Sequence, residues 1–296
     1  MKGFFAFLGV LIYFLPGAAI GQQRLEYYKL YTLNSGMTAE EIMQVMYYNK
    51  YSLFSHDYQQ VGEVFYVDAS GFTRKRIWKR QRIIKAGQDG ISYKDLVLIT
   101  YPTQLKGLAV LTWTYEDPAT DQNVWLWIPS LKKVRKISAS EDDDAFMGAD
   151  FTVEEVSTRR FEDENYKLIA EKEFKGYKIE QTGEVKFQGA PCFVIECTPK
   201  KPHWYYAKRV VWVDKKTGGE IFEEYYDKNN NLFKTLFRNW EFYDAKGGRK
   251  YPYQSALECK DLRTGHRTTI LMRDTKYDQG LSEYDFTVKS LMRSKW

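Results

Sequence analysis

Seven short turn signals, each set between extended aromatic-rich runs, constrain the fold of this chain more than any other feature. Gly, Asn and Asp are frequent in these turns, and these residues adopt the positive φ angles that tight hairpins require. Repeated hairpins indicate a meandering antiparallel sheet. A sheet of this length must curl, so we predict a mainly β fold with one concave face. The turns lie at residues 68–71, 86–90, 116–121, 215–219, 227–231, 244–248 and 263–266.

The first 21 residues have the pattern of a secretory signal peptide. Lys2 supplies a positive start, residues 4–15 are apolar, and Pro16-Gly17 ends the apolar run. Residues 19–21 are small where a signal peptidase reads the chain, so we expect cleavage before Gln22. An uncleaved membrane anchor is the alternative, but the apolar core is shorter than the roughly 20 residues that a span needs. The pattern predicts export.

Residues 22–296 have the length of one large β domain and contain neither a Pro/Ser-rich linker nor an internal repeat. Aromatic residues make up 17% of the chain, and 23 of its residues are Tyr. Tyr and Trp combine an apolar body with a polar tip, which suits strands and also a wall that contacts an amphiphile. The mild net charge of +5 excludes a strongly acidic binding protein and does not require nucleic acid as a partner.

Helical signals are few. Thr38 followed by Glu41 forms a capping box, and apolar residues at helical spacing after it predict an amphipathic helix of about 14 residues. A second helical or turn region is predicted between residues 142 and 160, where the acidic run Glu141–Asp144 suits a helix N-terminus. We expect the first helix to pack on the concave side of the sheet and the second region to interrupt the sheet.

Residue types that carry catalysis or bind metals are scattered. His56, His203 and His266 lie far apart, and neither HExxH nor CxxC spacing occurs, so we predict no metal site and no cofactor. A GxSxG elbow, a phosphate-binding glycine loop and a GxGxxG fingerprint are also missing from the sequence. We therefore predict that the protein is not an enzyme.

The three cysteines leave two alternatives open. Cys192 and Cys197 lie five residues apart in one extended run, so they face opposite sides and cannot bridge each other. A disulfide between Cys197 and Cys259 is possible in an oxidising compartment. Buried free thiols that pack as small hydrophobic groups are the favoured alternative.

Residues 74–85 form the most basic stretch of the chain. On a strand, Trp78 shares one face with basic residues at alternate positions, which are Arg74, Arg76, Arg80 and Arg82. Such a face could bind phosphate groups of anionic lipid or of nucleic acid, and export argues against nucleic acid. A solvated convex face, whose charges discourage aggregation, is the favoured alternative.

Four aromatic residues are predicted to share one face of two paired strands. Residues 108–115 and 125–128 are joined by the Asp117-Pro118 turn, so these runs should pair. Alternation then places the aromatic group on one side, and its members are Trp113, Tyr115, Trp125 and Trp127. Such a group suits core filling and equally suits the wall of a cavity that receives hydrocarbon.

Several ungapped motifs in order carry a family resemblance over residues 38–290. Three of these motifs are residues 106–118 (KGLAVLTWTYEDP), 121–138 (DQNVWLWIPSLKKVRKIS) and 146–152 (FMGADFT). A fourth motif, residues 207–214 (AKRVVWVD), has the pattern of a strand. With these motifs the chain resembles the bacterial outer membrane lipoprotein-sorting protein family, which is related to the periplasmic lipoprotein carrier LolA.

The resemblance implies a LolA-like half-barrel, in which helices cover the concave side of one strongly curved antiparallel sheet and acyl chains occupy an apolar cavity. We expect the aromatic group, Trp113, Tyr115, Trp125 and Trp127, to line that cavity. Residues 139–160 would form a lid, with Phe146, Met147 and Phe151 as a plug and Gly148 as a hinge.

The sequence thus predicts a periplasmic carrier of a Gram-negative bacterium that binds acyl chains of a lipid or lipoprotein for transport toward the outer membrane. The resemblance also implies an inner-membrane transporter of the RND/MMPL class as a neighbour. The alternative function is a non-enzymatic envelope interaction module that docks on such a transporter. An apolar cavity of several hundred Å³ would favour the carrier, and a cavity filled by the chain's own side chains would favour the module.

Overall fold

The computed structural model describes residues 28–117, 119–138, 143–157 and 159–292. The predicted signal peptide, residues 1–21, lies outside these ranges. None of the helices within them is long and apolar enough to cross a membrane.

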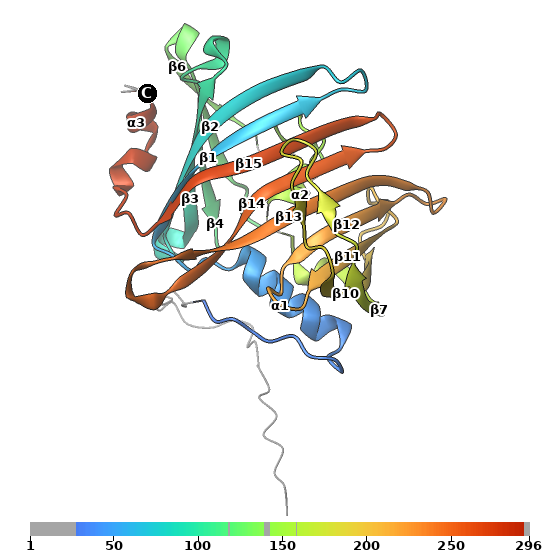
Figure 1. The fold of residues 1–296 in the computed structure, drawn as a ribbon. Helices are drawn as coiled ribbons and strands as arrows, with labels where there is room; N and C mark the ends of the chain where they lie inside the picture. The colour runs from blue at the N-terminus through green and yellow to red at the C-terminus, as the bar shows by residue number, and fades with distance from the viewer. Residues whose placement is uncertain (1–27, 118, 139–142, 158, 293–296) are drawn as a thin grey trace, which may run out of the picture.

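A single antiparallel sheet of 13 strands dominates the described part of the chain (Figure 1). Its strands are β1 (Asp57–Val67), β2 (Thr73–Ile84), β3 (Ile91–Tyr101), β4 (Ala109–Tyr115), β5 (Asn123–Ile128), β6 (Lys133–Ile137), β7 (Glu164–Phe174), β10 (Ala190–Pro199), β11 (Lys208–Asp214), β12 (Glu220–Tyr226), β13 (Leu232–Asp244), β14 (Lys250–Asp261) and β15 (His266–Tyr277).

The strand order is β6-β5-β4-β3-β2-β1-β15-β14-β13-β12-β11-β10-β7. Two meanders, β1–β6 and β10–β15, therefore join where β1 pairs with β15. The edge strands β6 and β7 do not pair with each other, so the sheet stays open instead of closing into a barrel. The prediction of one large antiparallel sheet in a half-barrel is confirmed.

Side chains that bond their own turn explain where the hairpins reverse. The Asp68 carboxylate accepts hydrogen bonds from the backbone N–H groups of Ser70 at 2.9 Å and Phe72 at 3.0 Å. Asp227 does the same in the turn after β12, accepting from the N–H of Asn231 at 2.9 Å. Asp in such a turn replaces the hydrogen bonds that a strand would provide. All seven predicted turns lie between consecutive strands of the sheet.

The helix α1 (Ala39–Tyr51) identifies the concave face of the sheet, which we call the inner face. Its buried side chains, such as Ile42 and Met46, pack against Phe193 of β10 and Val211 of β11. The same helix contacts β7 at the sheet edge and also β14, five places away in the strand order. A flat sheet could not reach both sides of one helix, so the sheet curls around α1, as predicted.

The predicted capping box starts α1. The backbone N–H of Glu41 donates to Thr38 Oγ1 at 3.2 Å, and the Glu41 carboxylate accepts from the Thr38 N–H at 2.8 Å. The helix has 13 residues, close to the predicted length.

The second helical region lies within the predicted residues 142–160, but its helix begins well after the acidic run. This helix is α2 (Val153–Val156), only four residues long, and its capping box is formed by Thr152 and Glu155. Residues 141 and 142 of the acidic run lie outside the described residues, and the exposed Asp143 and Asp144 precede the helix. A side chain that caps backbone N–H groups fixes where a helix starts, whereas nearby acidic residues only favour a start.

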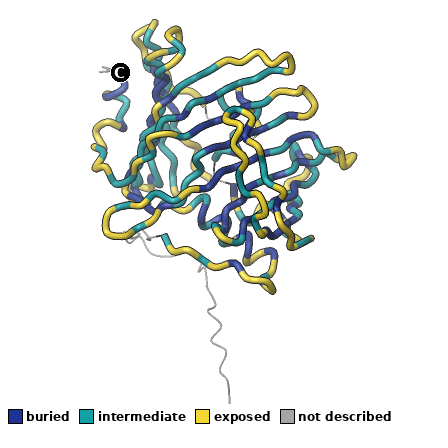
Figure 2. Tube along the Cα trace, in the orientation of Figure 1, coloured by how far each residue is buried: buried dark blue, intermediate teal, exposed yellow. Residues whose placement is uncertain are grey.

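Two segments cover the outer, convex face of the sheet. The hairpin of β8 (Tyr177–Lys178) and β9 (Val185–Lys186) packs against Phe237 of β13. The C-terminal segment, formed by the short helices η7 (Glu283–Phe286) and α3 (Val288–Met292), packs over β3, β4 and β5. Figure 2 shows buried residues along the strands and exposed residues at the hairpin tips.

Gly62 of β1 makes room for Trp78 of β2 on the inner face. The two residues are paired across the strands, and a Cβ at position 62 would lie 2.1 Å from Trp78 Cζ2. We predict that Gly62→Ala displaces the indole and lowers the free energy of unfolding by about 1–3 kcal/mol. Urea unfolding followed by circular dichroism measures this change. In a Trp78→Val background the cost of Gly62→Ala should disappear, and an unchanged cost there would contradict the steric explanation.

Candidate functional site

A contiguous apolar surface occupies the centre of the inner face, and we call it the inner apolar surface. Strands on both sides of the β1–β15 junction contribute its buried side chains, which are Val64, Trp78, Ile99, Leu236, Leu257, Cys259 and Ile270. Half-buried Tyr66, Val97 and Met272 extend it. Because these side chains present almost no polar atoms, the surface suits hydrocarbon.

Residues 143–157, which we call the cover segment, lie on the inner apolar surface. Phe151 is fully buried there, and Phe146 and Met147 pack against the same cluster. The segment is folded on itself, since the Phe146 N–H donates to the Phe151 carbonyl at 2.8 Å and Ala145 bridges to Thr152. Side chains of the chain itself therefore fill this part of the concave face.

A few hydrogen bonds, mostly from side chains, attach the part of the cover segment before Thr152 to the sheet. Thr268 Oγ1 donates to Asp150 Oδ2 at 2.7 Å and accepts from the Asp150 N–H at 3.0 Å. Arg76 Nη1 donates to the Met147 carbonyl at 3.2 Å, and Cys259 Sγ donates to the Asp150 carbonyl at 3.4 Å. No described residue of the segment belongs to the 13-stranded sheet. Its displacement would therefore leave the strand ladder intact.

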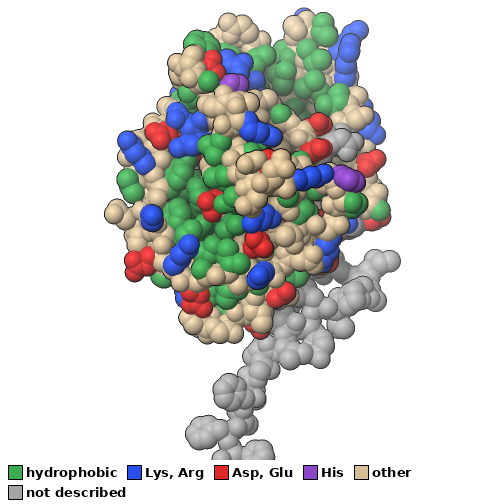
Figure 3. All heavy atoms as spheres, turned by 90° about the vertical axis from the view of Figure 1, so that its right-hand side faces the viewer, with side chains coloured by type: hydrophobic (Ala, Val, Ile, Leu, Met, Phe, Trp, Pro, Cys, Tyr) green, Lys and Arg blue, Asp and Glu red, His purple; other side chains and the backbone are tan. Residues whose placement is uncertain are grey.

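The open side of the molecule is also partly apolar. Figure 1 shows the tips of the β1–β2 and β14–β15 hairpins on the right, and Figure 3 views the molecule from that side. Hydrophobic side chains gather there between Lys, Arg, Asp and Glu side chains. An apolar area with a charged border is typical of a surface that meets an amphiphile or another protein.

A group of ten buried charged residues, which we call the buried ion cluster, lies on the inner face beside α1. Its cations are Lys50, Arg159, Arg209, Lys234 and Arg238, and its anions are Glu154, Glu155, Glu164, Glu220 and Glu223. The formal charges cancel, which is what burial of so many ions requires.

Arg209 is the centre of the buried ion cluster. Its Nε and Nη2 bind both carboxylate oxygens of Glu164 at 2.8 and 2.6 Å, and its Nη1 binds Glu223 Oε2 at 2.8 Å. Arg238 binds Glu223 as well, and its Nη2 donates to the backbone carbonyl of Glu155 at 2.7 Å. The cluster thus connects the edge strand β7 to β11, β12, β13 and the end of the cover segment.

The cluster shifts the ionisation of its carboxylates. Burial opposes ionisation of Glu164, but the guanidinium groups of Arg209 and Arg159 outweigh it, and the pKa of Glu164 lies below its usual range. Burial likewise opposes ionisation of Glu223, yet Arg238 and Arg209 hold its pKa well below the usual range. Both carboxylates therefore stay charged at neutral pH.

The predicted aromatic group lies on the outer face. Its members share one face as expected: Trp113 and Trp125 meet edge to face with ring centroids 5.1 Å apart, and Tyr115 bonds Asn123, the residue opposite Trp113. However, Trp113, Trp125 and Trp127 pack with Phe286 and Leu291 of the C-terminal segment. The predicted wall and the predicted lid thus lie on opposite faces of the sheet.

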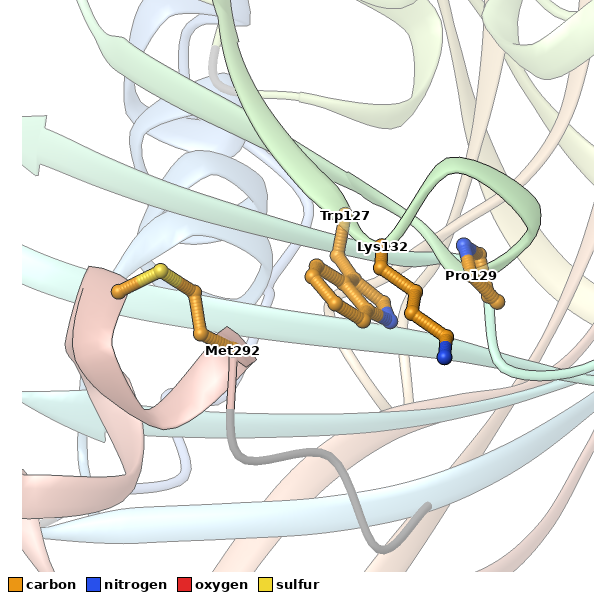
Figure 4. A pocket seen from close by; sticks show the side chains of 4 residues that line it. All are labelled: Trp127, Pro129, Lys132 and Met292. Atoms are coloured by element: carbon orange, nitrogen blue, oxygen red, sulfur yellow. The ribbon is translucent and has the colours of Figure 1, made fainter.

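The C-terminal segment is held on the aromatic group by polar contacts. Trp113 Nε1 donates to the Phe286 carbonyl at 3.1 Å, and Glu283 binds Lys85 at 2.7 Å and Lys94 at 2.8 Å. A groove of about 430 Å³ lies at its margin, lined by Trp127, Pro129, Lys132 and Met292 (Figure 4).

The basic face of β2 also lies elsewhere than the favoured prediction placed it. Arg80 and Arg82 share the inner face with Trp78, because Arg80 pairs with Val97, which packs on the inner apolar surface. Their side chains are 26% and 12% exposed. The expectation of a solvated convex face is therefore wrong for these two residues, since alternation cannot say which face of a strand is inside.

The remaining candidate residues carry little chemistry. All three cysteines are buried free thiols, so the Cys197–Cys259 disulfide is absent and the favoured alternative is confirmed. Burial raises the pKa of the Cys192 thiol to about 12, which makes it a poor nucleophile. In the described ranges no group of three His, Cys, Asp or Glu side chains could hold a metal ion.

The buried ion cluster was not predicted from the sequence. The signal that was available is complementary charge on consecutive strands: β12 begins Glu-Ile-Phe-Glu-Glu, while Arg209 precedes it on β11 and Arg238 follows it on β13. Charged residues on strands are usually solvated, so this pattern alone does not predict burial.

Comparisons with known proteins identify relatives of this fold. A family model described as "Uncharacterized protein" matches residues 92–293, more than half of the chain. A search among curated proteins found no match. A solved domain from Vibrio parahaemolyticus, described as an outer membrane lipoprotein-sorting protein, is 25% identical with a TM-score of 0.65, and the match covers 86% of this chain and 98% of that domain.

Two further solved structures match an equal share of the chain. A DUF1329 family protein from Desulfovibrio piger is 26% identical with a TM-score of 0.63, covering 86% of this chain and 95% of that protein. A LolA superfamily protein from Nitrosomonas europaea is 17% identical with a TM-score of 0.54, covering 86% of this chain and all of that protein (100%). At this lower identity the likeness shows a shared fold.

We predict that Arg209→Met destabilises the protein strongly. The change leaves Glu164 buried without its main cation and removes one of the two arginines that bind Glu223, which should lower the free energy of unfolding by about 3–5 kcal/mol. Lys208→Met is the matched control, because Lys208 binds Glu196 at 3.2 Å with both side chains partly exposed, and it should cost less than about 1 kcal/mol. Equal losses in the two variants would contradict the central role of Arg209.

Acid should weaken the fold through the same carboxylates. A lowered folded-state pKa means that Glu164 stabilises the fold above its unfolded pKa of about 4.3 and loses this contribution as pH falls below that value. We therefore expect constant stability between about pH 7 and pH 5 and a decline below about pH 4. Urea unfolding at a series of pH values measures this dependence of the free energy of unfolding on pH. Glu164→Gln should flatten the decline, and an unchanged slope would show that Glu164 does not titrate in this window.

Proposed function

Because this chain belongs to the LolA-like family of outer membrane lipoprotein-sorting proteins, we propose that it is a periplasmic carrier of acyl chains. Its predicted signal peptide, residues 1–21, would export it to the periplasm. The inner apolar surface would hold the acyl chains of a lipid or lipoprotein, and the cover segment would close over them. This role requires binding and release and no catalytic residue.

The observation that carries this proposal is the separate attachment of the cover segment. Phe146, Met147 and Phe151 lie on an apolar surface to which they are tied by few hydrogen bonds. A surface that must sometimes be empty needs such a cover, because exposed hydrocarbon surface promotes aggregation. Gly148, at φ 74° between the two halves of the segment, supplies the freedom that a hinge needs.

The energetics of exchange are reasonable for a carrier. Each buried CH₂ group of an acyl chain contributes about 0.8 kcal/mol, so one chain binds well without any hydrogen bond. Displacing the cover loses the burial of three large side chains, which offsets part of this gain. A small net free energy allows both uptake and release.

The aromatic group lies beside a separate groove. The groove at Trp127, with a volume of about 430 Å³, is partly apolar and lies on the outer face. A ligand role for Trp113, Tyr115, Trp125 or Trp127 stays a prediction, and it would concern this groove rather than the inner apolar surface.

A second candidate function is favoured by one observation. The chain's own side chains fill the inner apolar surface around the fully buried Phe151, as expected for an interaction module that carries no lipid. The partner predicted for such a module, an RND/MMPL-type inner-membrane transporter, stays a prediction.

Binding of a fluorescent fatty acid separates the two functions. We expect saturable binding by the purified protein and tighter binding by Phe146→Ala and Met147→Ala, because a smaller plug is displaced more easily. A loss of about 1.4 kcal/mol of cover burial corresponds to a tenfold gain in affinity.

Phe72→Ala is the matched control, since Phe72 is 63% exposed in the β1–β2 turn; it should leave the affinity unchanged. Circular dichroism and the melting temperature check the fold of each variant. Absence of binding in the wild type would refute the carrier and favour the module, while equal affinities in all variants would show that the cover segment does not gate the surface.

A further inference from the structure

Two arginines and one aspartate form a charged group at the margin of the inner apolar surface. Arg80 binds Asp95 through Nε at 3.2 Å and Nη2 at 2.7 Å, and Arg82 binds the same carboxylate through Nε at 2.8 Å and Nη2 at 2.6 Å. Two guanidinium groups thus share one carboxylate. The group carries a net formal charge of +1 in a half-buried position.

The strand register places this charge beside apolar side chains. Arg80 follows Trp78 by two residues on β2, so both face the inner side, and Arg80 pairs with Val97 of β3. Val97 in turn pairs with Val110 of β4, which pairs with Leu126 of β5. Val110 and Leu126 are half-buried, and neither packs into the apolar clusters of the described residues. A half-buried aliphatic strip therefore runs directly away from the arginines.

Neighbouring rings hold the guanidinium groups in place. The Arg82 guanidinium carbon lies 3.6 Å from the centroid of the Tyr93 ring, and the Tyr58 ring lies 5.4 Å from Arg82 and 5.7 Å from Arg80. Stacking and the shared carboxylate fix both side chains before any ligand arrives, which reduces the entropy lost on binding.

Each arginine keeps donors that the structure does not use. In both arginines, Nε and Nη2 donate to Asp95. No described residue accepts a hydrogen bond from Nη1 of Arg80 or of Arg82. Burial opposes ionisation of Asp95, but Arg80 and Arg82 outweigh it and hold its pKa below the usual range, so the carboxylate remains charged. The Asp95 carboxylate compensates the charge of one arginine, so the charge of the other arginine is available to an anionic ligand.

We propose that Arg80 and Arg82 bind the anionic head group of a lipid, a phosphate or a carboxylate, whose acyl chains lie on the adjacent inner apolar surface. The inference rests on the proposed carrier function and deepens it, because it assigns the charge of the cargo. Guanidinium groups match the geometry of phosphate and carboxylate oxygens. A half-buried site strengthens such a bond relative to water.

Isothermal titration of the purified protein with two short-chain lipids tests this inference. Phosphatidylglycerol carries an anionic phosphate group and diacylglycerol carries no anionic group, and the two are used with identical acyl chains. We expect the wild type to bind phosphatidylglycerol about tenfold more tightly, as one charge-assisted hydrogen bond would give. Arg80→Gln should reduce this preference to less than about twofold and leave the affinity for diacylglycerol unchanged.

Three variants make the result specific. Arg80→Gln leaves Arg82 paired with Asp95, so it should fold, and circular dichroism with the melting temperature checks this. Arg80→Lys keeps the charge and should retain most of the preference. Lys79→Gln removes an exposed cation from the adjacent position on β2, whose side chain points to the opposite face, and it should retain the full preference.

The outcomes separate this inference from the carrier function. Equal affinities of the wild type for the two lipids would overturn the head-group site while leaving the carrier intact. Failure to bind either lipid would overturn the carrier function itself. Stabilisation of the wild type by inorganic phosphate, lost in Arg80→Gln and accompanied by no lipid preference, would assign the arginines to a free anion and overturn the lipid site.

Discussion

The bidentate pairing of Arg209 with Glu164 is the interaction on which the inner face depends. Glu164 begins the edge strand β7, so the pair ties an edge of the open sheet to its interior. Arg209 also binds Glu223, and Glu223 binds Arg238, which reaches the backbone of the cover segment. Because buried charges are costly unless matched, each partner fixes the position of the next. The network therefore determines how strands, helix and cover fit together, more than it adds to stability.

The same network limits where the cover segment can move. Its C-terminal end is fixed, since the Glu155 carboxylate binds Lys234 and its carbonyl accepts from Arg238. The part before Thr152 is held mainly by Asp150 and the Met147 carbonyl. A displacement of Phe146 and Met147 can thus occur while α2 stays in place.

Local signals in the sequence predicted much of the fold. Turn residues such as Asp68 and the capping box of Thr38 act within a few positions of the chain, and both features lie where we predicted them. The pairing of β4 with β5 followed from the turn between them. The order of the motifs also identified the family correctly.

The candidate site was harder to predict because faces and buried charges are set by distant parts of the chain. Alternation predicts that Trp113 and Trp125 share one face of the sheet, but it cannot tell whether that face is the inner or the outer one. The C-terminal segment packs on these residues, on the outer face. For the same reason, alternation could not predict that Arg80 lies on the inner face. Arg209 and Glu164 are 45 residues apart in the sequence, and no local sequence pattern predicts that they pair.

The open shape of the sheet has a consequence for the behaviour of the protein in solution. Within the described residues neither edge strand has a neighbour on its outer side, and unpaired backbone groups there can template self-association into extended assemblies. Exposed Lys133, Arg135 and Lys136 occupy one edge, and exposed Lys167 and Glu171 occupy the other. Two copies of β6 would bring like charges together. The open half-barrel therefore carries, at its β6 edge, charges that oppose pairing of this edge with a second copy of itself.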